Sequence, residues 1–300
     1  MHTIQRTLSL LFAAAALSAT LHSQDKLKDG TSLTWDKTIG VGQDSLMNDT
    51  VMVPARTVPV YEADDSQVAK LLEKVIPGSS FKKQGKLLSA SDVIFPAASE
   101  SPVQLLAGIE RDKKANLSTL KLAFLQAGTP LVGNDAKLNE AVRDLGVKLN
   151  KGVVQEQIDD WNKQLDKAGN KAESASKASD KTQGKLNKSQ SKVAKASKER
   201  SKLQGDHAVL QKEIDLLNQK WTLSQDPKDL NKLTKARGKI TKNESKMAKA
   251  MKAEADGQKD VSKYTEALPD AQKTEQAKAA TQAEVQRTVD ALQRKMESIR

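Results

Sequence analysis

A long 3.5-residue apolar repeat dominates the second half of this 300-residue chain. Over residues 158–221, spacings of three and four residues alternate through nineteen positions, and fourteen of these positions are apolar. A repeat kept over this length is typical of a coiled-coil helix, because it holds one apolar face toward a partner. The same spacing returns over residues 233–299. The sequence therefore predicts two long helical arms, 134–223 and 228–300.

A short loop at 224–227 joins the two predicted arms. Ser224, Asp226 and Pro227 provide a helix stop, an N-cap and a first-turn proline. Arms joined by so short a loop fold back on each other, so facing residues have numbers with a constant sum. The two apolar rows match when that sum is 450, which pairs Leu217 with Leu233, Ile214 with Ala236, Leu210 with Ile240 and Leu203 with Met247.

The middle of this predicted hairpin is its weakest part. The first arm carries small residues there, such as Ala175 and Ser179, which bury little apolar area. The second arm contains Pro269, and a proline inside a helix costs about 3 kcal/mol. A kink or break is predicted near 265–269. The polar run 167–198 is expected to fray, with a disordered low-complexity segment as the alternative.

Residues 1–24 have the pattern of a secretory signal peptide. Arg6 precedes a short apolar run, and small residues that suit cleavage follow it. The run is too short to span a bilayer, which requires about 20 residues. The chain contains no cysteine, so a lipoprotein anchor and a disulfide framework are both excluded. The expected location is the periplasm or cell surface, with no transmembrane segment after signal removal.

A small α+β domain is predicted at 51–133, after a flexible arm at 25–50. Its expected elements are an edge strand at 51–61 that carries two prolines, a helix at 66–76 capped by Asp64, Asp65 or Ser66, and strands at 81–88, 92–96, 103–109 and 117–125. Both faces of the last strand are apolar, so it should be central. The predicted fold class is α+β: a small antiparallel sheet with one packed helix (β-α-β-β-β), followed by a long antiparallel coiled-coil hairpin.

The net charge of +11 is concentrated near the loop between the arms. Residues 181–252 contain 19 Lys or Arg and 7 Asp or Glu, a balance of +12, whereas 25–133 are neutral. Such a basic region attracts polyanions. The candidate anion-binding residues are Lys185, Lys188, Lys192, Lys195, Lys198, Lys235, Arg237, Lys239, Lys242 and Lys246.

Two interpretations of this charge remain open. The simpler one is the solvated face of a lysine-rich helix. The other is a site for an anionic envelope polymer or lipid. Export argues against genomic nucleic acid as a partner, and no aromatic residues alternate with the lysines, as single-strand binding would favour.

The residues needed for catalysis or for metal and cofactor binding are missing from the sequence. His207 is the one histidine that follows the predicted signal and it lies in the coiled-coil repeat, where pairing with Asn243 would form a polar layer that fixes the register. Arg200 and Glu254 lie close enough across the hairpin to pair. No phosphate-binding glycine motif is present, and the serines have no base to activate them. We predict no enzyme activity, no cofactor and no metal site.

The order of these segments resembles an uncharacterised family of exported proteins from Bacteroidota-type bacteria. The resemblance covers the signal, the helix at 66–76, the stretch from Val93 to Val103, the strand at 117–125, a helix around 141–165 and the charged coiled coil. The lysine-rich loop region departs from the family pattern. The family has no assigned activity, so the resemblance implies location and architecture only. It also makes two triplets look like O-glycosylation acceptors, with Ser45 and Thr50 as the modified residues.

These patterns favour a non-enzymatic envelope protein in which a small domain presents a coiled-coil hairpin as a spacer or interaction arm. The partner would be an unknown envelope protein or an anionic surface polymer. The positions outside the apolar rows look too polar for a second large interface, which favours a monomer or weak dimer. An enzyme with a pocket on the sheet of 51–133 is the third possibility.

Overall fold

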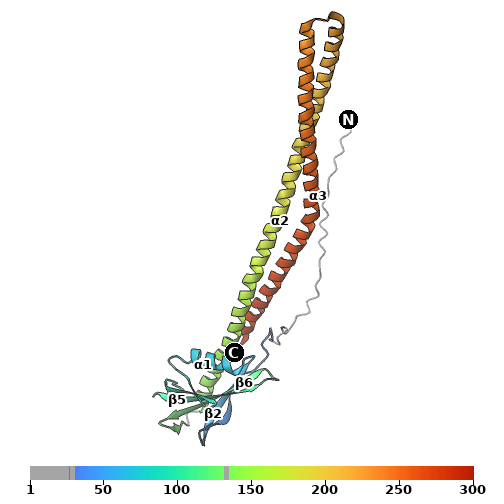
Figure 1. Ribbon diagram of the computed structural model, residues 1–300. Coiled ribbons are helices and arrows are strands. Elements are labelled where there is room, and N and C mark those ends of the chain that lie inside the picture. Colours follow the sequence, from blue (N-terminus) through green and yellow to red (C-terminus); the bar gives the residue numbers. More distant parts are fainter. Residues whose placement is uncertain (1–26, 28–30, 132–134) are drawn as a thin grey trace. The chain divides into compact units, whose positions relative to one another are not determined.

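The computed structural model describes residue 27 and residues 31–131 and 135–300 (Figure 1). The signal-peptide prediction at 1–24 lies outside the described residues. The chain divides into two compact units. The sheet unit comprises the described residues up to Gln157 together with Ala291–Arg300, and the hairpin unit is Ile158–Asp290.

The sheet unit is built on seven antiparallel strands in the order β1-β2-β6-β5-β4-β3, with the short β7 paired to β6. The first helix, α1, spans Asp65–Val75. The strands are β1 (Gly42–Asn48), β2 (Val51–Tyr61), β3 (Lys82–Gln84), β4 (Leu87–Val93), β5 (Val103–Asp112), β6 (Leu117–Gln126) and β7 (Thr129–Pro130). The general class predicted from the sequence, α+β with an antiparallel sheet, is confirmed, but the sheet has more strands than the predicted β-α-β-β-β order.

Two predicted elements are confirmed in detail. Strand β6 is central, because it pairs with β2 on one side and β5 on the other. Helix α1 begins at a capping box, in which the Asp64 side chain accepts from the Gln67 backbone N–H and the Gln67 side chain accepts from the Asp64 backbone N–H. The cap satisfies backbone donors that the first helical turn cannot use.

Strand β2 is not the edge strand that its two prolines predicted. It lies between β1 and β6, but the two pairings are staggered: β1 covers 51–57 and β6 covers 56–61. Pro54 and Pro59 therefore each lie in a stretch that has a neighbouring strand on one side only. A residue without a backbone N–H is tolerated there for the same reason as at an edge.

The arm predicted at 25–50 is not irregular throughout, because residues 42–48 form β1. Most side chains of this strand are polar, so its sequence shows no apolar alternation. A tight turn in which Asp49 has φ 51° pairs it with β2 as a hairpin. Earlier residues of the arm also pack on the sheet: Trp35 meets the Tyr61 ring edge-on at 5.5 Å, and Ile39 is buried.

The strands predicted at 81–88 and 92–96 have different bounds in the structure. The first is split by a turn in which Gly85 has φ 61°, which yields β3 and the start of β4. The second is wrong as a separate strand. Asp92 belongs to an irregularity at the end of β4, and the chain then turns after Phe95, whose carbonyl accepts from the Ala98 and Ser99 backbone N–H groups.

Both faces of the sheet are apolar, and each is covered differently. On one face lie α1 and the first turns of α2 (Asp135–Ser224), where Gly152 allows close approach to Leu71 of α1 and Gly146 allows close approach to Val58 of β2. On the other face, Leu46 of β1 reaches over to Gly108 of β5. The curled sheet encloses a second core there, formed by Leu46, Val53, Ala55, Leu106, Ala123 and Leu125.

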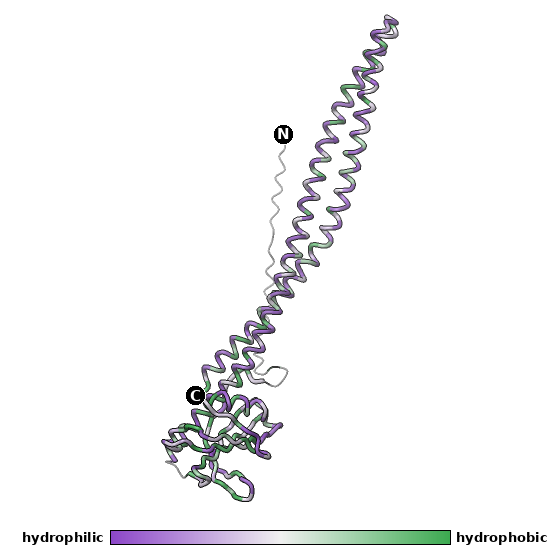
Figure 2. The backbone as a smooth tube through the Cα atoms, turned by 60° about the vertical axis from the view of Figure 1, so that its left-hand side comes forward, coloured by the Kyte–Doolittle hydropathy of each residue, from purple (hydrophilic) through white to green (hydrophobic). Residues whose placement is uncertain are grey.

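The hairpin unit consists of the rest of α2 and most of α3 (Pro227–Ser298), which run side by side in Figures 1 and 2. The turn between them lies at the predicted place. Gln225 has φ 50°, and the Asp226 side chain accepts from the Lys228 backbone N–H at 2.8 Å. Asp229 completes the turn by accepting from the Ser224 hydroxyl at 3.1 Å.

Side chains of α2 and α3 meet at several levels of the hairpin unit. Close to the turn, Ile214, Leu233 and Ala236 form a cluster with Leu217 and Ile240. The predicted Arg200–Glu254 ion pair is present at 3.2 Å. Farther from the turn, Val193 lies against Gly257, which has no side chain to obstruct it. In each of these contacts the residue numbers add up to about 450.

The predicted weak zone stays helical. Residues 167–198 lie within α2, and α3 is one continuous helix through Pro269, so the prediction of fraying and the prediction of a break are both wrong. Figure 1 shows α3 changing direction partway along its length, and the predicted kink at Pro269 stays a prediction. Packing is nevertheless thin here: among the described residues of α3, none between Gly257 and Thr288 is buried.

Within the described part of the chain, no helix has the length and apolarity required to cross a bilayer.

Candidate anion-binding surface

All ten basic residues predicted to bind anions are exposed and lie on the hairpin unit. The structure brings six of them together in two groups of three, each beside a shallow groove. It keeps the two groups apart along the hairpin, because the first lies at residues 188–195 of α2 and the second at residues 239–246 of α3.

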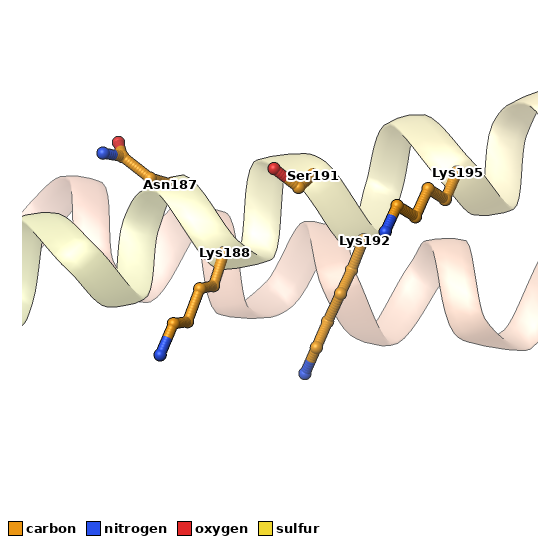
Figure 3. Close-up of a pocket in the computed structure, with 5 residues that line it drawn as sticks. All are labelled: Asn187, Lys188, Ser191, Lys192 and Lys195. Carbon is orange, nitrogen blue, oxygen red and sulfur yellow. The ribbon is translucent and has the colours of Figure 1, made fainter.

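The first group is Lys188, Lys192 and Lys195, which surround an open groove of about 360 Å³ together with Asn187 and Ser191. Figure 3 shows the side chains of Lys188 and Lys192 extending in the same direction from α2. Their spacing of four and three residues places them on one face of the helix. All lining residues come from α2 and are polar, so this groove offers charge but no enclosed pocket.

The second group is Lys239, Lys242 and Lys246, which line an open groove of about 480 Å³ between α3 and α2. Asn243 of α3 and the α2 residues Leu203, Asp206, Val209 and Leu210 complete it. Within the described residues, none of these three lysines has an ion-pair partner at salt-bridge distance. The groove therefore combines free positive charge with apolar and hydrogen-bonding groups.

The other four candidates lie outside the grooves. The Lys185 ammonium is 5.4 Å from the centre of the Tyr264 ring, a cation–π arrangement across the two helices. Arg237 donates to the Asn218 side-chain oxygen at 3.1 Å. Lys198 and Lys235 are exposed. Lys185 and Arg237 thus help to hold the helices together as well as adding charge.

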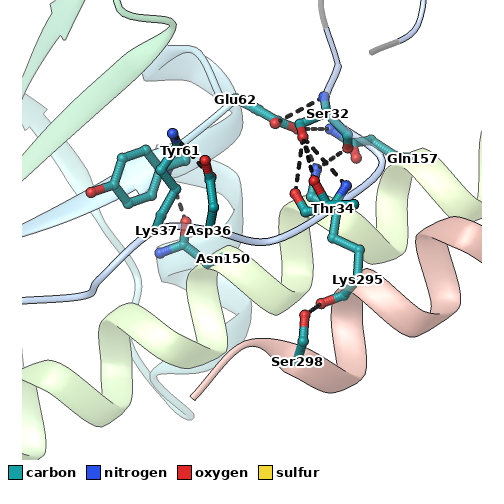
Figure 4. Close-up of polar contacts among 10 residues, drawn as sticks. All are labelled: Ser32, Thr34, Asp36, Lys37, Tyr61, Glu62, Asn150, Gln157, Lys295 and Ser298. Atoms are coloured by element: carbon teal, nitrogen blue, oxygen red, sulfur yellow. Dashed lines mark hydrogen bonds and ion pairs between the residues drawn. The ribbon is translucent and has the colours of Figure 1, made fainter. Parts of the chain in front are cut away.

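A second polar cluster, in the sheet unit, is centred on the buried Lys295 and has a structural explanation (Figure 4). The Lys295 ammonium is 2.6 Å from a Glu62 carboxylate oxygen and donates to the Ser32 carbonyl at 2.7 Å. The same carboxylate accepts from the Gln157 side chain at 3.1 Å and from the Ser32 backbone N–H at 3.1 Å. These contacts satisfy both charges, so the cluster fixes the last turns of α3 to the sheet.

Asn150 plays a related role on α2. Its side-chain oxygen accepts from the Tyr61 backbone N–H at 2.9 Å, and its amide donates to the Pro59 carbonyl at 2.9 Å. Both groups belong to the part of β2 that β1 does not reach. The buried Asn150 side chain thus provides the backbone hydrogen bonds that a neighbouring strand would otherwise provide.

Lys121 lies between two carboxylates on the face of the sheet that carries Leu46, 2.7 Å from Asp44 and 2.5 Å from Glu110. The hydrogen bonds to Asp44 and then Glu110 raise the pKa of Lys121 above its usual value. The hydrogen bond from Lys121, followed by that from the Ser45 backbone, lowers the pKa of Asp44. The raised pKa keeps Lys121 protonated and the lowered pKa keeps Asp44 ionised around neutral pH, so this pair is suited to a structural ion pair and not to proton transfer.

The structure gives His207 a contact other than the predicted one. Its Nε2 atom lies 3.3 Å from Glu244, the neighbour of Asn243. Among the described residues, no group of three His, Cys, Asp or Glu side chains could hold a metal ion. His207 is thus a polar contact between the two helices.

The two predicted glycosylation residues lie on the β1–β2 hairpin. Ser45 is half-buried within β1 and pairs with Pro54, so it is not in a flexible arm as predicted. Thr50 is exposed on the turn between the strands. Thr50 is therefore the more accessible of the two hydroxyls.

Sequence reasoning missed two features of the hairpin unit. The first is the groove beside Lys239, because its shape depends on side chains from both helices. The second is a row of exposed apolar residues on α2, at Val209, Leu216 and Leu223, which contradicts the expectation that the outer positions are polar. Their seven-residue spacing is visible in the sequence and could have identified this row.

No protein-family model and no curated protein matches this chain.

Proposed function

We propose that this protein is a non-enzymatic, exported envelope protein whose sheet unit carries a coiled-coil hairpin as a spacer or interaction arm. The proposal includes the antiparallel register in which facing residues sum to 450. Its expected location is the periplasm or cell surface, and its expected state is a monomer or weak dimer.

The burial pattern of the two long helices is the observation that carries this proposal. Every one of the nineteen positions of the apolar repeat in α2 is buried or half-buried. The α3 positions whose numbers sum to 450 with these nineteen are also buried or half-buried, except for Lys278, which is exposed. Two helices that cover each other's apolar rows leave an outer surface that is mostly polar apart from the row Val209, Leu216 and Leu223, which suits an extended arm better than a globular core.

A comparison between the full chain and a shortened hairpin tests this function. Equal numbers of heptads are removed from α2 and α3 around the turn, so that the remaining register is kept. Envelope extract from the source cells is then passed over both immobilised proteins. A partner retained by the full chain and lost from the shortened one supports the proposal, and identical retention contradicts it.

Polyanion binding is the second candidate function. It is supported by the balance of +12 over residues 181–252 and by the exposure of all ten candidate residues. Contacts of this kind weaken steeply as ionic strength rises. Changing Lys192, Lys195, Lys239 and Lys242 to Glu should abolish binding to an anionic polymer. The control changes four exposed lysines of the sheet unit to Glu: Lys82, Lys83, Lys113 and Lys114.

A further inference from the structure

The groove between α2 and α3 lies where the positive charge of the hairpin is most concentrated. Residues 198–213 and 237–252, which face each other in the proposed register, contain ten basic and four acidic residues, a balance of +6. Lys239, Lys242 and Lys246 point this charge at the groove from one face of α3. An anionic ligand is therefore favoured at this level of the hairpin.

A buried, unpaired acceptor distinguishes this groove from a merely charged surface. Asn243 lines the groove and is 8% exposed, and among the described residues its side-chain oxygen has no hydrogen-bond partner. Buried acceptors are rarely left unpaired, because the loss of water must be compensated. The carboxylate of Asp206 adds a second acceptor at the same groove. A ligand that donates hydrogen bonds would pair with the Asp206 carboxylate, and with the Asn243 oxygen once the side chains that cover this oxygen move aside.

The apolar part of the groove is small. Val209 is 67% exposed, whereas Leu203 is buried and Leu210 half-buried in the helix contact. Leu216 and Leu223 of the exposed row lie outside the groove, so Val209 alone offers too little apolar surface there for an acyl chain. An acyl chain also has no hydrogen-bond donor for Asn243. The C–H face of a sugar ring needs only such a small apolar contact, and its hydroxyls supply the donors.

We infer that this groove binds a hydroxylated sugar ring carrying a carboxylate or phosphate, as one unit of an acidic polysaccharide. The lysines neutralise the acid group, Asn243 and Asp206 accept from hydroxyls, and Val209 contacts the ring. The groove volume of about 480 Å³ is within the range of small-ligand sites. This inference rests on the second candidate function and adds a requirement for hydroxyl groups.

Two probes of equal charge test that requirement on the full chain. Oligogalacturonate carries carboxylates and hydroxyls, and polyacrylate of the same number of carboxylates carries no hydroxyl. We expect oligogalacturonate to bind at least tenfold more tightly by calorimetry at fixed salt. Asn243→Leu should reduce that preference about tenfold, and Asn243→Ala is the second variant in case the larger side chain disturbs helix packing. Circular dichroism checks that both variants fold.

Two lysine variants provide the matched comparison. Changing Lys239, Lys242 and Lys246 to Gln should weaken the binding of both probes and remove the preference for oligogalacturonate. Changing Lys188, Lys192 and Lys195 to Gln should weaken the binding of both probes but keep the preference for oligogalacturonate. Equal binding of both probes by the unchanged protein overturns this inference and leaves polyanion binding intact. If neither probe binds, both ideas fail, and tighter binding to phosphatidylglycerol vesicles than to oligogalacturonate assigns the groove to lipid instead.

Discussion

The two units of this protein reach stability in different ways. The largest fully buried side chains, among them Leu72, Leu122 and Leu149, all belong to the sheet unit. In the hairpin unit the repeat positions are often half-buried, and many are small or polar. Figure 2 shows the same contrast, with hydrophobic colour gathered in the sheet unit and alternating with hydrophilic colour along the hairpin.

This contrast predicts different responses to mutation. A core made of side chains from distant parts of the sequence loses much when one of them changes, because the neighbours cannot rearrange independently. A two-helix contact distributes its stability over many layers, each of which contributes little. The hairpin can therefore carry small and polar residues at many of its repeat positions.

The largest expected effect comes from breaking the buried ion pair of the sheet unit. Lys295→Ala leaves the half-buried Glu62 carboxylate without its cation, and the loss of one partner of a buried pair costs up to about 3–5 kcal/mol. Arg200→Ala in the hairpin unit breaks a more exposed pair, for which about 1 kcal/mol or less is expected. Hydrogen exchange measured separately for each unit gives both values. Similar losses in the two units would contradict the comparison.

Pro269→Ala should stabilise the hairpin unit by up to about 3 kcal/mol, the difference between proline and alanine inside a helix. Local hydrogen exchange around residues 260–275 should slow, while the sheet unit stays unchanged. An unchanged exchange rate would mean that the bend of α3 already removes the strain.

Two glycines in α2 should respond with opposite signs to substitution by alanine. A side chain at Gly146 would collide with Val58, and overpacking costs typically 1–3 kcal/mol. Gly205 has open space around it, so Gly205→Ala should stabilise its helix by about 1 kcal/mol. Chemical denaturation of each variant measures the changes. A gain at Gly146 would show that packing there is looser than the structure indicates.

The smallest effect is the acid dependence of the sheet unit. The pKa of Asp44 is lowered in the folded state, so its bond to Lys121 contributes stability above the unfolded pKa. That contribution is lost as the pH falls through the lower, folded pKa. Asp44→Asn should therefore flatten the acid side of a melting-temperature profile below about pH 4. Glu100→Gln, at another exposed carboxylate, is the control and should leave the profile unchanged.

Part of the candidate site could be predicted from the sequence and part could not. The ten basic residues and the Arg200–Glu254 pair could be identified, because charge and helical spacing are local properties. The groove itself could not, since it depends on how Val209 and Asp206 of α2 lie beside Asn243 and Lys239 of α3. Those neighbours are at least thirty residues apart in the chain.

The sequence by itself determined the two long helices, the turn between them, helix α1 with its Asp64 cap, and strands β2 and β6. Each has a period or a terminal signal that acts within a few residues. Only the tertiary structure decided that the polar residues 42–48 form a strand, that Leu46 reaches Gly108, and that Lys295 meets Glu62. These contacts join residues from distant parts of the chain, and their energy comes from burial that exists only once the whole unit has folded.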